Sequence, residues 1–398
     1  MLRNIIRMKS KFDMKKIFYL SRSMFPSPKT HALSILRLCQ AFHDAGHKVI
    51  LGGIEPNGEA TDPIKYYNLC GGFKIIRFKL NWLIRNAIAQ RMMFDSIYLA
   101  FKYRQLINNF KPDLIYSRLT LLELLFVPKK LPIIYEMHSL GNLGKSKVRK
   151  AFFMLLLRKK SFKRIVVTTQ FLCEQLHEML PGIEIKLTRL SAEPPVQIKS
   201  KDLQRFKEEK LQGKHYINHV GYTGNLDTKG LPGIEIICLV AEVMPDIAFH
   251  IVGGSAEDVK YWSNAYAKKL NNLFFYGFRD SAEIPYFLNL FDIVLAPLQY
   301  KPNPRAPQGR GMSPLKVPEY MSYNKTIVAS DIPSHREILK DGSNALMVTA
   351  DDVAQWVKAI KKLTDNPDLG MKLSAKAKEE YYNEFTPTKR VETILGDL

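Results

Sequence analysis

Cysteine is scarce in this chain of 398 residues, and its thiols form no recognisable ligand set. Cys39, Cys70, Cys173 and Cys238 stand far apart, with no Cys-x-x-Cys pair and no His-rich ligand spacing. This pattern argues against a disulfide scaffold and against a structural zinc site. We expect four buried thiols in a reducing compartment.

Long apolar runs are missing as well. A membrane-spanning helix needs roughly 18 or more apolar residues, and the longest candidate here covers only residues 151–157, between lysines and arginines. The first 13 residues are basic but have no apolar core, so they do not predict a secretory signal. We therefore expect a cytoplasmic protein.

Acidic residues are scarce in one half only. Residues 1–200 contain 34 Lys and Arg against 13 Asp and Glu, whereas residues 201–398 contain 25 of each. The whole net charge of +21 thus belongs to the first half, where a generally basic background would have spread it evenly. Such asymmetry predicts an anionic partner for that half, such as acidic lipid, a phosphorylated acceptor or nucleic acid.

Nucleic acid is the weakest of these partners, because no basic patch interleaved with aromatic residues and no known binding module stands out. The stretch Ser139–Ser146 nearly matches a P-loop but has Ser139 in the place of the first glycine, which argues against an NTPase. We expect no nucleic-acid partner.

The segment from Lys145 to Arg164 places many basic residues around an apolar centre. A helix of this kind either lies on an anionic membrane surface or packs on a sheet while its long basic side chains reach water. Because the charge of the whole half points the same way, we favour a peripheral position on the cytoplasmic face of the inner membrane.

The chain is long enough for two domains, and short apolar strands alternate with amphipathic helices along most of it. This rhythm predicts an α/β fold of two Rossmann-like, doubly wound halves with a cleft between them. The periodicity breaks after about residue 191. We predict a basic, acceptor-binding domain at 1–195, a donor-binding domain at 196–380, and a C-terminal helix at 381–398 that returns to the first domain.

A loop–helix–strand stretch near the end, residues 309–337, is the best candidate site. Ser313 is predicted as an N-cap with Pro314 at the first helical position, and Lys316 and Glu319 follow on adjacent turns. Free N–H groups at a helix N-terminus favour an anion, and Lys316 adds a full positive charge. Glu319 can accept hydrogen bonds from sugar hydroxyls.

Several stretches, in this order and spacing, resemble the retaining GT-B glycosyltransferases of family 4 (glycosyl transferases group 1). The pieces are Ala41–Phe42 with Gly46–His47, Pro112–Asp113 with Tyr116–Ser117–Arg118, Glu136–Met137–His138, Tyr222–Thr223–Gly224, Ile251–Val252–Gly253–Gly254, and Ser313–Pro314–Leu315–Lys316 with Glu319–Tyr320–Met321, Ser330–Asp331 and Glu337. The resemblance covers nearly the whole chain and is densest in its second half.

This resemblance implies a nucleotide-diphospho-sugar as donor substrate, with no cofactor. Glu319 would take the ribose hydroxyls, Lys229 and Lys316 the diphosphate, and His138 would contact the transferred sugar. The implied catalytic residues are His138, Lys316 and Glu319. The implied donor-binding residues are Gly224, Asn225, Lys229, Gly253, Arg310, Gly311, Met312, Ser313, Lys316 and Glu319. In retaining transfer of this kind, the acceptor attacks on the face that the diphosphate leaves.

Three departures from the family pattern stand out. Gly311 lies where a carboxylate is usual, so backbone or Arg310 must contact the sugar. Asn225 lies where many members have an arginine, which leaves Arg305 or Arg310 to replace it. A proline-rich, basic loop replaces the glycine pair after the first strand, and we expect it to hold an acceptor phosphate. The predicted acceptor-side residues are Lys29, Thr30, His31 and Arg118.

The chain contains no Asp-x-Asp signature, so we predict transfer without an obligate metal ion. We favour a lipid-linked or surface-polysaccharide acceptor, of the kind that lipopolysaccharide synthesis uses. Two alternatives stay open. A nucleotide-sugar 2-epimerase of the same fold would convert its substrate without an acceptor, and a catalytically idle relative would bind the donor as a scaffold.

Overall fold

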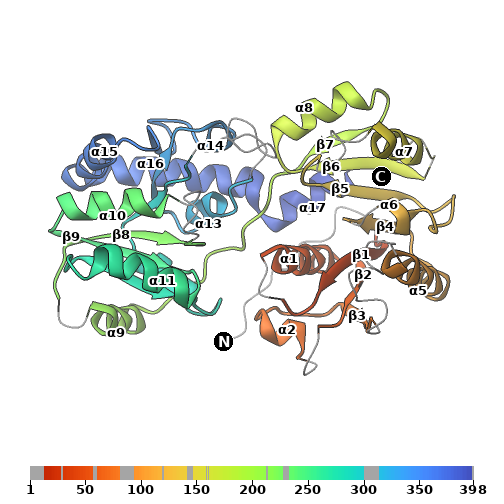
Figure 1. Ribbon diagram of the computed structural model, residues 1–398, viewed down its shortest axis with the longest axis horizontal. Helices are drawn as coiled ribbons and strands as arrows, with labels where there is room; N and C mark the ends of the chain where they lie inside the picture. Colours follow the sequence, from red (N-terminus) through yellow and green to blue (C-terminus); the bar gives the residue numbers. More distant parts are fainter. Residues whose placement is uncertain are drawn as a thin grey trace. The chain divides into compact units, whose positions relative to one another are not determined.

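The computed structural model describes residues 13–27, 30–56, 61–80, 94–118, 121–140, 147–157, 159, 161–211, 214–226, 233–299 and 313–396. The chain divides into two compact units (Figure 1). Unit 1 contains residues 1–188 and 387–398, and unit 2 contains residues 189–386. Each unit is built on one parallel sheet, so the predicted α/β fold of two doubly wound halves is confirmed.

Unit 1 alternates strands and helices along the chain. Its strands are β1 (Lys16–Met24), β2 (Lys48–Ile54), β3 (Lys74–Phe78), β4 (Leu114–Ser117), β5 (Ile133–Met137), β6 (Phe162–Val167) and β7 (Ile185–Leu187). Its helices are α1 (Thr30–Asp44), α2 (Pro63–Tyr66), α5 (Phe94–Phe110), α6 (Leu121–Leu124), α7 (Lys147–Leu157), α8 (Gln170–Met179) and α17 (Pro387–Leu395).

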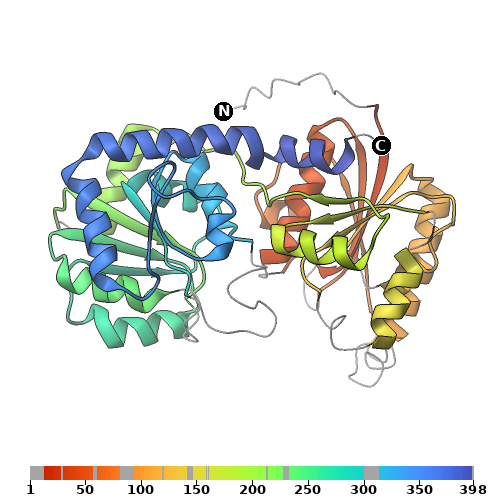
Figure 2. The ribbon, with the colours of Figure 1, turned by 90° about the horizontal axis from the view of Figure 1, so that it is seen from above.

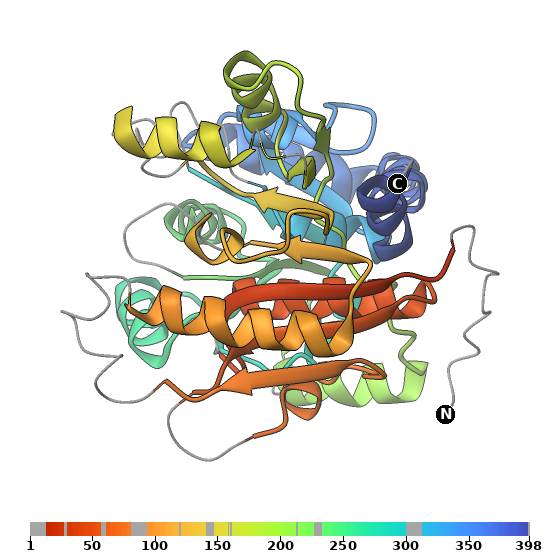
Figure 3. The ribbon, with the colours of Figure 1, turned by 90° about the vertical axis from the view of Figure 1, so that its right-hand side faces the viewer.

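The sheet of unit 1 has the order β3-β2-β1-β4-β5-β6-β7. Strand order reverses between β1 and β4, and ligands of such sheets bind outside the carboxyl ends of the strands at this point. Alternate residues of β1 face opposite sides: Phe18 and Leu20 pack with α5, α7 and α8, whereas Ile17 and Tyr19 pack with α1 and α17. Figure 3 shows α5 in front of this sheet.

Unit 2 repeats the pattern with a smaller sheet. Its strands are β8 (Asn218–Thr223), β9 (Ile247–Val252), β10 (Leu273–Gly277), β11 (Ile293–Ala296), β12 (Thr326–Ser330) and β13 (Leu346–Val348). Its helices are α9 (Ser200–Leu211), α10 (Ile234–Val243), α11 (Ala256–Trp262), α12 (Ile284–Leu290), α13 (Lys316–Ser322), α14 (Pro333–Arg336), α15 (Val353–Asp365) and α16 (Pro367–Glu380), with π-helical turns at Ser263–Ala267 and Tyr381–Phe385.

The sheet of unit 2 has the order β10-β9-β8-β11-β12-β13, with every pairing parallel. The reversal point therefore lies between β8 and β11. Strands β8, β9, β11 and β12 of this sheet are almost entirely buried, because both faces of the sheet are covered. One core includes Trp356 of α15 and Phe249 of β9, and the other includes Tyr320 of α13 and Phe287 of α12.

The chain passes between the two units at 188/189 and at 386/387, a few residues from the predicted boundaries of 195/196 and 380/381. Residues 189–195 belong to unit 2 because the Ala192 backbone is held there: its N–H donates to the Phe385 carbonyl, and its carbonyl accepts from Tyr381 Oη. The same contacts keep residues 381–386 in unit 2. Only residues 387–398, including α17, belong to unit 1.

Several local expectations need correction. Cys70 is exposed, although the other three cysteines are buried as predicted. Arg164 is not part of a basic surface helix: it lies in β6 and is buried. One side of α7 belongs to the core, because Phe153, Leu156 and Leu157 are buried, whereas Leu155 is 65% exposed. Helix α7 therefore packs on the sheet along this side, and its contact with a membrane stays a prediction.

Candidate functional site

The donor-side residues of unit 2 gather at the reversal point of its sheet. Gly224 directly follows β8, and α13 follows β11, the neighbouring strand. Helix α13 is tied to the end of β8 because the Thr223 N–H donates to Tyr320 Oη at 3.0 Å. The carboxyl ends of these two strands thus place Gly224 beside the first turn of α13.

Lys316 is the central charge of this site. Its Nζ donates to the Tyr222 hydroxyl and lies 3.9 Å from the centroid of the Tyr222 ring. Burial lowers the pKa of Lys316 to about 7, while the nearby Glu319 carboxylate opposes that shift. The ammonium group is thus held by a neutral phenol, and an anion in the site would favour its charged form.

Glycine is required at the end of β8 for a steric reason. A β-carbon at Gly224 would overlap Cε and Nζ of Lys316, and one at Gly253 would overlap the Gly224 carbonyl oxygen. The Gly224 N–H already donates to the Val252 carbonyl at 2.8 Å. Gly224 therefore makes room for the lysine, and its N–H group is already bonded within the fold.

Helix α13 begins later than predicted. Its first residue is Lys316, its N-cap is Leu315, and no side chain caps it. The predicted N-cap role of Ser313 is therefore wrong, because Ser313 lies three residues ahead of the helix. Glu319 is half-buried one turn beyond Lys316, and Asn225 is exposed in the turn after Gly224. Glu337, a member of the resembling motif, pairs with Arg189 at 3.1 Å.

Part of the predicted donor and acceptor set lies outside the described residues. These positions are Lys29, Lys229, Arg305, Arg310, Gly311 and Met312, and of Thr30 only the backbone is described. Their predicted roles stay predictions. His31 is exposed in the first turn of α1, directly after the loop that follows β1.

In unit 1, His138 lies just past the end of β5, beside the buried carboxylate of Glu136. His138 Nε2 is 2.5 Å from Glu136 Oε1, and Arg390 Nη2 of α17 is 2.9 Å from the same oxygen. Tyr116 Oη donates to Glu136 Oε2. Burial alone would raise the pKa of Glu136, but Arg390, His138 and Arg118 together hold it well below its usual range.

The imidazole of His138 is neutral near pH 7. Burial lowers its pKa and outweighs the opposing effect of Glu136. Because Glu136 stays ionised and only accepts, we assign the proton of His138 to Nε2. Arg118, after β4, interacts with the same carboxylate and with the Tyr19 and Tyr116 hydroxyls. The fold thus brings two predicted site residues, His138 and Arg118, to one carboxylate.

Sequence reasoning missed three members of these sites. Tyr222 and Tyr116 each read as an apolar strand residue, and their hydroxyl partners become visible only once the strands pair. Arg390 is 254 positions from Glu136 and carries no motif signal. A buried carboxylate needs a cation, so the Glu136-x-His138 pattern gave a reason to search for one but not its position.

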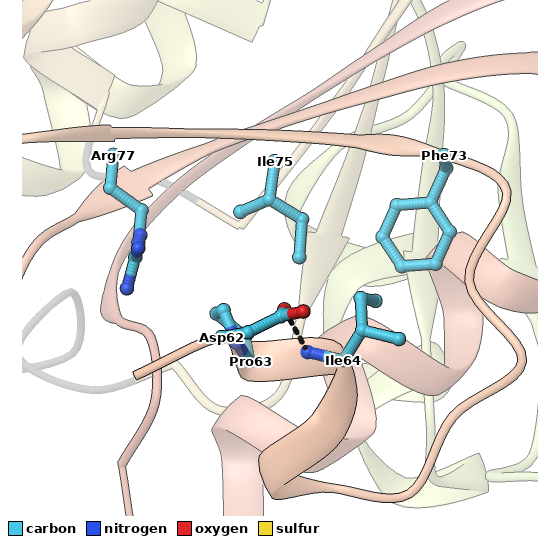
Figure 4. A pocket seen from close by; sticks show the side chains of 6 residues that line it. All are labelled: Asp62, Pro63, Ile64, Phe73, Ile75 and Arg77. Atoms are coloured by element: carbon cyan, nitrogen blue, oxygen red, sulfur yellow. Dashed lines mark hydrogen bonds between the residues drawn. The ribbon is translucent and has the colours of Figure 1, made fainter. Parts of the chain in front are cut away.

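A separate hollow of about 280 Å³ lies between α2 and β3 (Figure 4). Pro63, Ile64, Phe73 and Ile75 give it apolar walls. Its polar side chains form hydrogen bonds with the backbone: Asp62 Oδ1 accepts from the Ile64 N–H, and the Arg77 side chain donates to two carbonyl oxygens. It holds none of the predicted site residues.

Within the described residues no group of three or more His, Cys, Asp or Glu side chains is placed to hold a metal ion. In the same part of the chain no helix has the length and apolar character to cross a bilayer.

Two parallel α/β units, each with polar groups at the carboxyl ends of its strands, define a protein of GT-B type. Residues 32–187 match the family described as Glycosyltransferase Family 4, and residues 217–366 match Glycosyl transferases group 1. Together these matches cover about three quarters of the chain. The chain therefore belongs to the GT-B glycosyltransferases that combine these two halves.

Two curated relatives are similar to this chain over part of their length. The candidate glycosyltransferase EpsD of Bacillus subtilis (strain 168) is 28% identical over 173 residues, which are 43% of this chain and 42% of that protein. The candidate teichuronic acid biosynthesis glycosyltransferase TuaH of the same strain is 27% identical over 169 residues, 42% of this chain and 37% of that protein. The chain thus matches about two fifths of the length of these curated relatives.

Solved structures share the fold over almost the full length. Anabaena Alr3699/HepE, crystallised with UDP and glucose, superposes with a TM-score of 0.68 at 17% identity. The superposition covers 96% of this chain and 100% of that one. At this level of identity the likeness concerns the fold alone.

Proposed function

We propose that the protein transfers a sugar from a nucleotide-diphospho-sugar to a glycan acceptor, with retention of anomeric configuration and without an obligate metal ion. The observation that carries the donor assignment is Lys316, held over Tyr222 at the reversal point of unit 2 with a pKa of about 7. A lysine in this position gains its full charge when a diphosphate approaches, and so stabilises the leaving group.

The proposed roles follow from this placement. Lys316 neutralises the departing diphosphate, together with Lys229, the second lysine that the resemblance implies. Glu319, one turn along α13, accepts hydrogen bonds from the ribose hydroxyls. His138 contacts the transferred sugar. The leaving diphosphate helps to deprotonate the acceptor hydroxyl, which attacks on the face that the diphosphate leaves, so the configuration at the anomeric carbon is kept.

The relatives guide the choice of substrates. HepE was solved with UDP and glucose, and this supports a UDP-sugar as the first donor to test. TuaH is named for teichuronic acid biosynthesis, which supports a surface polysaccharide or its lipid-linked precursor as acceptor. We therefore propose a place on the cytoplasmic face of the inner membrane, where such precursors are made.

The surface of unit 1 supports contact with an anionic bilayer, at a place that differs from the predicted α7 segment. Ile97 and Phe101 lie one turn apart on α5 and are 52% and 61% exposed. Leu125 and Phe126, just after α6, are 37% and 45% exposed. Arg104 of α5 donates to the Phe126 carbonyl, so both pairs belong to one surface, which we call the α5–α6 patch.

Exposed large apolar side chains are unusual when they gather, and they mark interaction surfaces. Arg104 lies within the patch, Lys102 is the neighbour of Phe101, and exposed Lys129 and Lys130 follow Phe126 after two residues. Apolar side chains with lysines and arginines around them suit the interface of an acidic bilayer.

The proposal is tested by a screen for binding and turnover with UDP-, GDP- and ADP-sugars. We expect one nucleotide to raise the unfolding temperature and its sugar to be transferred or slowly hydrolysed. A product that is the 2-epimer of the donor sugar would instead establish the epimerase. If His138→Ala and Glu319→Ala both leave biological function intact, the scaffold role holds.

A further inference from the structure

Glu136 is surrounded by hydrogen-bond donors. Its side chain is 1% exposed, and each oxygen is used: Oε1 accepts from His138 and Arg390, and Oε2 accepts from Tyr116. A buried ionised carboxylate is stable only when a cation and enough donors replace its hydration. Because Arg390 and His138 share one oxygen, the charge that Arg390 neutralises is the charge that His138 faces.

Arg390 reaches this position because one face of α17 is buried in unit 1. Arg390, Val391, Ile394 and Leu395 form its buried face, and the three apolar members pack in the core that contains Tyr116. In Figure 2 this helix, drawn in deep blue, ends over the sheet of unit 1.

A second buried arginine holds the far end of the helix. Arg164 of β6 donates from Nη1 to the Ile394 carbonyl at 2.6 Å, and it pairs with Glu184 through two hydrogen bonds of 2.9 Å each. Arg390 thus extends from α17 to Glu136 on β5, and Arg164 extends from β6 to the carbonyl of Ile394 on α17.

Three charged groups and burial set the charge of His138. Glu136 on β5 favours the imidazolium, whereas Arg118 after β4 and Arg390 on α17 disfavour it, and burial disfavours it most. The Tyr116 and Tyr19 hydroxyls, on β4 and β1, are buried and their pKa values lie well above the usual range, so both stay neutral. Removal of Arg390 alone leaves the Glu136 charge less compensated and makes protonation of His138 easier.

We infer that Arg390 is a positioning residue for His138: it shares Glu136 Oε1 with the imidazole and neutralises that carboxylate, so that it reinforces the effect of burial and the ring stays uncharged, with the proton on Nε2 directed at the carboxylate. This inference rests on the proposed function, in which His138 contacts the transferred sugar. The sugar gains positive, oxocarbenium-like character as the diphosphate leaves. A neutral imidazole is compatible with that charge, whereas an imidazolium would repel it. The C-terminal helix therefore acts on the sugar-transfer step rather than on donor binding.

The direct test is an NMR titration of the His138 ring in the protein without substrates, assigned by comparison with His138→Gln. In Arg390→Met we expect the titration midpoint of His138 to move to higher pH, and in Arg390→Lys to stay near the wild-type value. Lys389→Met removes the same charge from the exposed side of the same helix and should leave the midpoint unchanged. An unmoved midpoint in Arg390→Met overturns the inference.

Two further variants separate charge from folding. Arg164→Met loosens α17 but leaves the Glu136 pair in place, so we expect lower stability with an unchanged His138 midpoint. Glu136→Gln combined with Arg390→Met removes both members of the pair, so it is the variant to titrate if Arg390→Met alone does not fold. Because Glu136 is the group that favours the imidazolium, the double variant should titrate at a lower pH than the wild type, and an equal or higher midpoint contradicts the inference.

Activity gives the second readout. In Arg390→Met we expect the acid limb of the kcat profile to move to higher pH, so that kcat at pH 6 falls about tenfold while KM for the donor stays constant. If His138→Ala leaves kcat unchanged, the proposed role of His138 fails. If His138→Ala lowers kcat but Arg390→Met leaves the profile unmoved, only the inference about Arg390 fails.

Discussion

Lys316 lies over the position where a β-carbon of Gly224 would stand. The two residues come from different strand–helix units of the same sheet, and their contact exists because β8 and β11 are neighbours at the reversal point. Because Gly224 has no side chain, the ammonium group of Lys316 can occupy this place at the end of β8.

The first prediction concerns Gly224→Ala. The added methyl displaces the end of a flexible lysine, so we expect UDP affinity to fall about tenfold or more, whereas stability falls only by the strain of an unfavourable backbone, roughly 1–3 kcal/mol. Calorimetric titration with UDP and chemical denaturation measure the two effects.

Gly342→Ala is the matched control, because Gly342 also has a positive φ (+68°) but nothing within 4 Å of an added β-carbon. It should lose stability and keep UDP affinity. Equal losses of affinity in both variants would show that backbone strain, and not the lysine, explains the effect.

The second prediction follows from the pKa of about 7 for Lys316 in the free protein. A bound diphosphate stabilises the ammonium form and raises this pKa, so binding takes up a proton above pH 7. UDP affinity should be constant below pH 7 and should fall by up to about tenfold per pH unit above it. Calorimetry in buffers of different ionisation enthalpy measures the proton uptake.

The titration of Lys316 also makes the free energy of unfolding depend on pH, in the direction opposite to that of UDP affinity. The folded pKa of Lys316 is about 7 and its unfolded pKa is about 10.4, so between these values the unfolded chain binds more protons. The contribution of Lys316 to stability therefore rises with pH across that window, while UDP affinity falls. Lys316→Met should abolish the pH dependence of UDP affinity and reduce that of stability, to which Lys325, with a pKa of about 8, also contributes. A steep pH dependence of UDP affinity that persists in this variant would assign the effect elsewhere.

Much of the fold could be predicted from the sequence, because parallel strands buried on both faces read as short apolar runs. The βα alternation gave two doubly wound sheets, and α13 with Lys316 and Glu319 stood out as a candidate anion site. Ser313 was misplaced as an N-cap because the loop before α13 continues to Leu315 without a side-chain cap. Helix boundaries depend on such local choices, which sequence patterns constrain weakly.

The buried charges were the hardest to predict. Arg164 reads as a member of a basic run, yet it lies in β6 and pairs with Glu184. Arg390 reads as an ordinary residue of an amphipathic terminal helix, yet it completes the Glu136 site. Each pair joins elements that are distant in sequence, and no short-range pattern specifies such pairs.

The third prediction concerns Arg164. Arg164→Met leaves the Ile394 carbonyl without its donor and removes the partner of Glu184. We expect a loss of about 2–4 kcal/mol in the free energy of unfolding, since it removes one partner of a buried network. Glu184 is 43% exposed, so Glu184→Gln should cost much less. Equal costs for both variants would contradict the role of the Ile394 contact.

The fourth prediction tests the α5–α6 patch. We expect the double variant Phe101→Ser, Phe126→Ser and the charge reversal Lys129→Glu, Lys130→Glu each to reduce sedimentation with phosphatidylglycerol vesicles several-fold. Neither wild type nor variant should bind phosphatidylcholine vesicles strongly. The buried Arg164 must be left out of any such reversal, because its loss would destabilise unit 1.

Reversal of Lys159 and Lys163, beside α7, is the comparison for the originally predicted segment. If it releases the protein while the patch variants still bind, the membrane contact belongs to the predicted basic segment, residues 145–164. If no variant changes sedimentation with acidic vesicles, membrane contact by unit 1 is wrong.

The fifth prediction is that EDTA leaves sugar transfer unchanged. The proposed chemistry stabilises the leaving diphosphate with lysine charge, so it needs no divalent ion. Loss of activity in EDTA with recovery on addition of manganese would overturn this part of the proposal.

The central claim is that Lys316 binds the diphosphate of a nucleotide-sugar donor. Calorimetric titration of UDP into wild type and Lys316→Met at pH 6.5 tests it most directly. The account predicts binding to the wild type and a loss of about a hundredfold or more in the variant, since the variant removes a desolvated charge from a diphosphate site. Equal affinity in the two proteins would contradict it.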